Sequence, residues 1–154
     1  MKLDNAQSIR IKIMDFLARR EHTSKEIFQK MEKKVESLNI LREQIQKLID
    51  EGLIDNKRFA EQYIHSRSSK GYGPLRIRQQ LIKEGVNETS SQSLMESQDW
   101  SCLAKLVLEK KTGKSIPEER NDILKIKRFL NYRGFNHSQI EEAFSLIRNQ
   151  ENDR

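Results

Sequence analysis

The sequence predicts an all-α protein made of three tandem three-helix repeats that form an elongated, curved array. Glycine and proline are scarce, with 6 and 2 residues among 154, and the residues that dominate the chain favour helices over strands. No segment alternates apolar and polar residues as a half-buried strand does. A pattern of Leu, three residues, Gly, an apolar residue and Asn occurs at 81–87 and at 130–136, with a weaker copy at 48–55.

The recurring pattern predicts joints between helices. We expect its glycine to end a helix in the left-handed conformation and the apolar residue after it to pack back on the last turn. The Asn or Asp that follows is suited to cap the next helix. The spacing of the two best copies lies within the range typical of stacked helical repeats, which predicts three such units.

The first repeat is expected at residues 6–54, and apolar residues recur every three or four positions in its first and third helices. Those residues are Ile9, Ile13, Phe16 and Leu17, then Leu38, Leu41, Ile45, Leu48 and Ile49. Its helices are expected near 6–20, 24–34 and 37–51.

The second and third repeats are expected at residues 55–97 and 98–148. Helices of the second are expected near 56–69, 74–84 and 88–96. Helices of the third are expected near 99–111, 118–133 and 137–148. A loop with Gly113 and Pro117 separates the first two helices of the third repeat.

The positive charge is concentrated in two stretches. The formal net charge is +6; residues 57–83 hold seven basic residues against one acidic, and residues 105–133 hold nine against four. Such a distribution favours a polyanion or an acidic protein surface as partner, although solvated helix faces also produce it. Because 35% of the residues are hydrophobic and 34% charged, thin helical layers suit this chain better than one thick core.

Membrane insertion and secretion are not expected. No stretch approaches the roughly 18 apolar residues that a membrane span requires, and the first residues lack the apolar core of a secretory signal. We therefore expect a soluble, cytoplasmic protein. The single cysteine, Cys102, lies in an apolar helical stretch and is expected to be buried and inert.

The stretch KGYGPLRIRQQLIKEGV, residues 70–86, could cradle phosphate, contact nucleic acid or simply join two helices. As a joint, Gly71 closes one helix, Gly73 caps the next and Pro74 fits its first turn. A helix N-terminus beside Lys70 also attracts phosphate, so a backbone contact with phosphate stays open.

Catalytic sites are not evident in the sequence. The 70–86 loop places Arg76 where a dinucleotide-binding motif needs its last glycine, and no strand precedes it. The three histidines have no cysteine or carboxylate at metal-ligand spacing. We expect a binding protein rather than an enzyme, without metal, cofactor or small-molecule substrate.

Helical periodicity separates the cations of this region into two groups. Arg78 falls within the apolar arc of its helix, so we expect it to lie inside or between helices, held by a carboxylate such as Glu61. Arg67 shares the apolar face of the preceding helix near its end. The exposed cations that we expect to contact a partner are Arg58, Lys70, Arg76, Lys83, Lys125 and Arg128.

Four blocks, in order and over nearly the whole chain, resemble the bacterial RecX regulatory protein family. They are FLARREHTSKEI (16–27), LIDEGLIDNKRFAEQYIHSR (48–67), KGYGPLRIRQQLIKEGV (70–86) and KRFLNYRGFNHSQIEEAF (127–144). The most specific parts are the aspartate turn before Arg58 and the Arg-Gly-Phe turn at 133–135. We assign structural roles to Asp55, Phe59, Arg67, Gly71, Gly73, Pro74, Arg78, Gly85, Arg133, Gly134 and Phe135.

The resemblance implies a fold of three tandem three-helix units and a role in regulating the recombinase RecA. Members of the family bind the RecA filament on DNA, typically along its helical groove, and reduce strand exchange and ATP hydrolysis. The resemblance implies no enzymatic activity, and it allows some direct binding to DNA. We expect a monomer with the RecA filament as partner. The alternative is a stand-alone basic helical module that binds nucleic acid.

Overall fold

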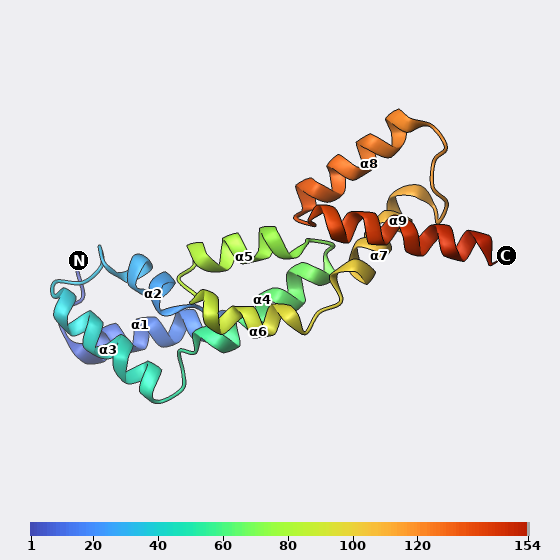
Figure 1. Ribbon diagram of the computed structural model, residues 1–154. Coiled ribbons are helices and arrows are strands. Elements are labelled where there is room, and N and C mark those ends of the chain that lie inside the picture. Colours follow the sequence, from blue (N-terminus) through green and yellow to red (C-terminus); the bar gives the residue numbers. More distant parts are fainter. Residues whose placement is uncertain (154) are drawn as a thin grey trace. The chain divides into compact units, whose positions relative to one another are not determined.

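The computed structural model describes residues 1–153, and all the regular structure in this range is helical apart from one isolated bridge between Leu3 and Val35 (Figure 1). The helices are α1 (Ala6–Arg19), α2 (Ser24–Met31), α3 (Leu38–Asp50), α4 (Asn56–Ser69), α5 (Pro74–Lys83), α6 (Glu88–Glu96), α7 (Trp100–Thr112), α8 (Arg120–Arg133) and α9 (His137–Asn152). None of the helices in residues 1–153 combines the length and apolarity needed to cross a bilayer.

The predicted all-α fold is confirmed, and each expected helix is present within a few residues of its expected bounds. Two ends differ by more than two residues. The second helix stops at Met31, its last buried residue, rather than near 34, and the last helix continues to Asn152 rather than 148. The division into repeats at 6–54, 55–97 and 98–148 stays a prediction.

Short polar side chains cap the starts of several helices. The side chains of Asn5, Ser37 and Asp99 each accept a hydrogen bond from a backbone N–H of the following first turn. Thr23 and Asn136 do the same within reciprocal capping boxes. Each such cap contributes about 0.5–2 kcal/mol, so the starts of these helices are encoded locally.

The glycine pattern forms the predicted joints. Gly52, Gly85 and Gly134 have φ of +77°, +88° and +106°. In each joint the residue after the glycine donates its N–H to the carbonyl of the leucine that opens the pattern, at 2.9 to 3.2 Å. This bond closes the last turn of the helix and confirms the left-handed helix end expected from the sequence.

The chain divides into two compact units, and the division passes through α4 and α5. The first unit comprises residues 1–62 and 81–91. Within it, α3 packs against both α1 and α2. The core of these three helices is formed by Ile9, Ile13, Ile27, Met31, Val35, Leu41, Ile45, Leu48 and Ile54.

The second unit comprises residues 63–80 and those from Gln92 onward. Within it, α7 packs against α8 and, most extensively, against α9. The buried residues of these helices are Trp100, Ala104, Leu108, Ile126, Leu130, Ile140, Ala143, Phe144 and Ile147. This unit holds the two turns on which the candidate site is built.

The expectation that Cys102 is buried is wrong, because its side chain is exposed. The buried face of α7 is defined by Trp100, Ala104 and Leu108. At 100° per residue, position 102 lies about 200° from position 100 and therefore on the opposite side of the helix. Because most of the stretch is apolar, its composition did not show which side of the helix faces the core.

Candidate interaction site in the second unit

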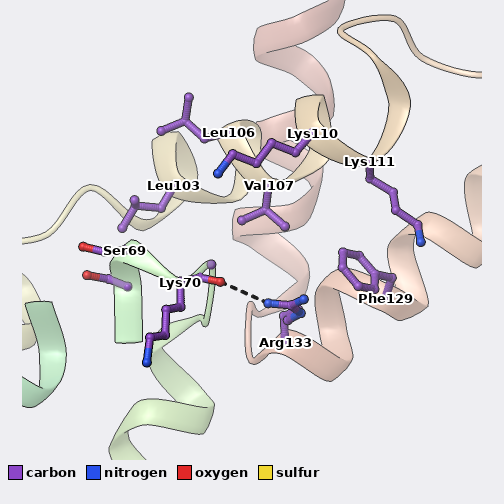
Figure 2. Close-up of a pocket in the computed structure, with 11 residues that line it drawn as sticks. Ser69, Lys70, Leu103, Leu106, Val107, Lys110, Lys111, Phe129 and Arg133 are labelled. Carbon is purple, nitrogen blue, oxygen red and sulfur yellow. Dashed lines mark hydrogen bonds between the residues drawn. The ribbon is translucent and has the colours of Figure 1, made fainter. Parts of the chain in front are cut away.

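The two most distinctive turns of the sequence are bonded to each other. The N–H of Gly73 donates to the carbonyl of Arg133 at 2.7 Å, and the N–H of Leu75 donates to the carbonyl of Gly134 at 2.9 Å. Arg133 returns a hydrogen bond from Nη1 to the carbonyl of Lys70 at 3.1 Å (Figure 2). The loop that precedes α5 and the turn that follows α8 are therefore a single structural element.

Glycine is required where these turns meet. A Cβ on Gly73 would lie 2.4 Å from the carbonyl carbon of Gly134. A Cβ on Gly134 would lie 2.6 Å from the Cβ of Arg76, and Gly134 also has φ of +106°. Backbone atoms cannot move aside as a flexible side chain can, so any larger residue at position 73 must separate the two turns.

Arginine and lysine side chains alternate with aromatic rings around this junction. The guanidinium carbon of Arg133 lies 5.0 Å from the ring centres of both Phe129 and Tyr72. That of Arg76 lies 4.7 Å from the ring centre of Tyr72 and 5.2 Å from that of Tyr132. Each contact is within the range of cation–π attraction, which contributes about 0.5–1 kcal/mol at exposed sites.

We call this set the basic-aromatic ladder. In order it consists of Lys111, Phe129, Arg133, Tyr72, Arg76 and Tyr132. Lys111 completes the series, with its Nζ 4.7 Å from the ring centre of Phe129. The ladder joins α7, α8 and the start of α5, and it holds its cations at defined positions without neutralising their charge.

One end of the ladder continues along the exposed face of α8. Tyr132 is 74% exposed, and Arg128 and Lys125 precede it by four and seven residues. These spacings place the three side chains on one side of a helix. Because Arg76 contacts the ring of Tyr132, three of the expected partner-binding cations, Lys125, Arg128 and Arg76, form one continuous basic face.

An open groove lies on another side of the same junction, with a volume of about 550 Å³ (Figure 2). Its apolar residues are Leu103, Leu106 and Val107 of α7 and Phe129 of α8. Its basic residues are Lys70, Lys110, Lys111 and Arg133. None of the described residues that line the groove is acidic.

Two of the other expected partner contacts, Arg58 and Lys83, belong to the first unit. Arg58 is half-buried and donates to Glu21 at 2.6 Å and to the carbonyl of Gly52 at 3.1 Å. The hydrogen bond that Arg58 donates to the Glu21 carboxylate raises the pKa of Arg58 above its ordinary value. Lys83 is exposed but belongs to the first unit, where its carbonyl accepts from Lys25 at 2.9 Å. These bonds give Arg58 a structural role, and a partner contact by either residue stays a prediction.

Arg78 is exposed, so the expectation of an interior position is wrong, whereas an inter-helix contact of Arg78 with a carboxylate stays a prediction. In α5 only Ile77 and Leu81 are buried, while Leu75 and Ile82 are 43% and 44% exposed. The buried arc of α5 is therefore narrower than the apolar arc of its sequence, and Arg78 falls outside it. Arg67, by contrast, is half-buried, with its guanidinium 5.1 Å from the ring centre of Tyr63.

Sequence patterns did not identify the aromatic half of the ladder or the groove. Tyr132 and Phe129 lie in a helix whose apolar spacing indicated only a core face, and Lys110 and Lys111 were counted only as charge. One sequence signal could have pointed to Tyr132: it follows the expected partner-binding Arg128 by four residues, on the same side of a helix, and lies just before the glycine turn. Its partner Arg76, which also contacts Tyr72, lies far away in the chain, so their approach needed the tertiary structure.

Comparisons with known proteins agree with this architecture. Residues 55–90 match the second three-helix domain of RecX, and residues 102–144 match the third. Regulatory protein RecX of Halorhodospira halophila is 34% identical over 140 residues, which are 90% of this chain and 87% of the relative. Regulatory protein RecX of Pseudomonas entomophila is 34% identical over 145 residues, which are 93% and 94% of the two chains.

A solved structure has the same fold. The crystal structure of RecX from Lactobacillus salivarius is similar with a TM-score of 0.81 at 25% identity, over 92% of this chain and 96% of that one. The glycine joints, the helical repeat fold and the identity over most of the chain lead to one assignment: this chain belongs to the RecX regulatory protein family.

Proposed function

We propose that this protein binds the RecA filament assembled on DNA and inhibits strand exchange and ATP hydrolysis by RecA. The observation that carries the proposal is membership of the RecX family over about nine-tenths of the chain. The protein then acts by binding as a cytoplasmic monomer, without catalysis of its own.

The contact surface that we propose is the basic face formed by Arg76, Arg128 and Lys125. Its cations are exposed, and Arg76 is held in place by two tyrosine rings. A nucleoprotein filament carries DNA phosphates and acidic protein groups, so a fixed basic face both attracts and orients the protein on it. Lys70 is also exposed, and it lines the groove at the same junction.

The test is the single-stranded-DNA-dependent ATPase of RecA with increasing amounts of the purified protein, with strand exchange measured in parallel. Unchanged rates at saturating protein would refute the proposed function. The double variant Lys125→Glu/Arg128→Glu should need about tenfold more protein for half-inhibition, since two charge contacts of roughly 0.7 kcal/mol each are lost. Arg76→Glu/Lys83→Glu should also weaken inhibition while its circular-dichroism spectrum remains helical.

A matched control keeps the net charge of the variants but changes a different surface. Lys33→Glu/Lys47→Glu replaces two exposed lysines of the first unit. Inhibition by this control should remain within about twofold of the wild type, because neither lysine belongs to the α8 face and exposed charges are screened by salt. An equal loss in the control would show that total charge, not the α8 face, determines binding.

A second candidate function is direct nucleic-acid binding, which the exposed tyrosine and arginine side chains of the ladder favour. Aromatic rings beside cations are the elements that single-strand binders use for stacking and phosphate contact. Affinity for naked DNA should then fall with salt, with a slope of about −0.7 per phosphate neutralised on single strands or −0.9 on duplex. Strong binding to naked DNA at about 0.15 M salt, without added RecA, would favour this alternative.

A further inference from the structure

We propose that the groove lined by α4, α7 and α8 is a docking site for an acidic peptide segment that carries apolar side chains. The segment would belong to the protein partner of the proposed function, so in that respect this proposal rests on the proposed function. It is separate from the basic face of α8, because the groove is formed mainly by α7.

The apolar side of the groove is incompletely covered in this chain. Leu106 is 54% exposed, and Leu103 and Val107 lie three residues before it and one after it on α7. Phe129 approaches from α8 on the other side (Figure 2). An apolar strip at spacing i, i+3, i+4 with a ring opposite is the arrangement that receives the apolar face of a docked helix.

The basic side of the groove determines the charge of the occupant. Lys110 and Lys111 come from α7, and Arg133 and Lys70 come from the junction of the two turns. These four basic residues line the same groove as the apolar strip, and none of the described lining residues is acidic. An occupant with carboxylates therefore gains charge complementarity, whereas a basic or neutral one does not.

The order of residues along α7 defines how the two kinds of contact alternate. Lys110 follows Leu106 by four residues, and Lys111 follows Val107 by four residues, so each lysine lies one turn beyond an apolar side chain. A segment that places carboxylates one helical turn from its apolar residues matches this order. A segment of the same composition without that spacing does not.

The groove is better suited to a peptide than to a nucleic-acid base. Three of its four apolar residues are aliphatic and offer no aromatic face for stacking. The fourth, Phe129, already contacts the Nζ of Lys111 at 4.7 Å and the guanidinium of Arg133 at 5.0 Å. The cations of the ladder therefore already lie over this ring, where a base would have to stack.

The direct test is fluorescence anisotropy with the full-length protein and three fluorescein-labelled probes. The first is a helical peptide of about 14 residues with Leu at positions i, i+3, i+4 and i+7 and mainly Glu and Asp elsewhere. The second has the same composition in scrambled order, and the third is an oligo(dT) of similar length. We expect saturable binding of the first peptide and at least about fivefold weaker binding of the second, since its apolar anchors no longer align.

The groove is tested with two variants and two matched controls. Leu106→Asp and Lys110→Glu/Lys111→Glu should each weaken peptide binding by about tenfold or more. Leu124→Asp, at a leucine of α8 that is 40% exposed outside the groove, and Lys33→Glu/Lys47→Glu should change it by less than about twofold. Unchanged fluorescence of Trp100, which is buried on α7, verifies that each variant is folded.

Several results would overturn the proposal. These are absence of peptide binding, equal binding of the scrambled peptide, and equal losses in the groove variants and their controls. If the protein binds oligo(dT), and Leu106→Asp loses this binding rather than peptide binding, the groove is a nucleic-acid site instead. Leu106→Ala repeats the test with a smaller change if Leu106→Asp alters the fluorescence of Trp100.

The RecA assay separates this proposal from the proposed function. If the wild type fails to inhibit RecA but binds the peptide through Leu106, the proposed function is wrong and the groove stands as a peptide site. If the wild type inhibits RecA and Leu106→Asp inhibits equally well, the function stands and RecA does not supply the segment. The expected result is that Leu106→Asp needs about tenfold more protein for half-inhibition.

Discussion

Replacing Gly73 with alanine should destabilise the second unit by about 2–4 kcal/mol. The added Cβ would lie 2.4 Å from the carbonyl carbon of Gly134 and 2.5 Å from the backbone nitrogen of Phe135. The turns must therefore separate, which breaks the bonds from Gly73 to Arg133 at 2.7 Å and from Leu75 to Gly134 at 2.9 Å. Each unsatisfied buried group costs about 1–3 kcal/mol, and water that enters the gap recovers part of the total.

Urea unfolding followed by tryptophan fluorescence measures this loss, because the single tryptophan, Trp100, lies in the second unit. Gly113→Ala is the matched control in the same unit. Gly113 has φ of +72° but nothing within 4 Å of its added Cβ, so only backbone strain of about 1–2 kcal/mol is expected. Gly73 has no positive φ, so its cost comes from the contact alone. The reasoning is refuted if Gly73→Ala costs less than about 1 kcal/mol.

Two further predictions concern the first unit. Burial lowers the pKa of His22, and the charge of nearby Lys30 lowers it further, whereas the hydrogen bond to the Arg20 carbonyl raises it. The net shift is downward, so folding favours neutral His22. The stability that neutral His22 contributes is present above about pH 6.5 and is lost as pH falls through the lower folded pKa. In His22→Asn the free energy of unfolding, measured by urea titration near pH 5 to 7, should therefore depend less on pH. Asp55→Ala should cost about 0.5–2 kcal/mol, because the Asp55 carboxylate accepts two N–H groups of the first turn of α4. Asp55→Asn should recover most of this loss, and thermal unfolding that is unchanged in Asp55→Ala would contradict the capping role.

Helix positions were largely predictable because their signals are local. Asn136 caps α9 and Gly134 ends α8 through bonds to residues within one turn, and both were expected from the repeated pattern. Asp55 was likewise expected at the start of α4. Capping and left-handed glycine conformations depend on a few consecutive residues, so a single sequence contains enough information to place them.

The burial of individual side chains was less predictable. Arg78 and Cys102 both lie in apolar stretches and are both exposed, whereas His22 is 2% exposed. In His22 the ring Nδ1 lies 3.0 Å from the carbonyl of Arg20, and Nε2 lies 2.9 Å from the Nζ of Lys30. Helical periodicity gives the direction of a side chain, but the width of the buried arc depends on which neighbouring elements cover it.

The sequence by itself determined the helical fold, the joints between helices and the family. Only the tertiary structure decided that the turns around Lys70 and Arg133, separated by 63 residues, form one junction. The same approach brings Tyr72, Arg76 and Tyr132 together and places the basic groove beside α7. The physical reason is range: caps and glycine turns are stabilised by consecutive residues, whereas cation–π contacts and grooves exist only where distant segments pack.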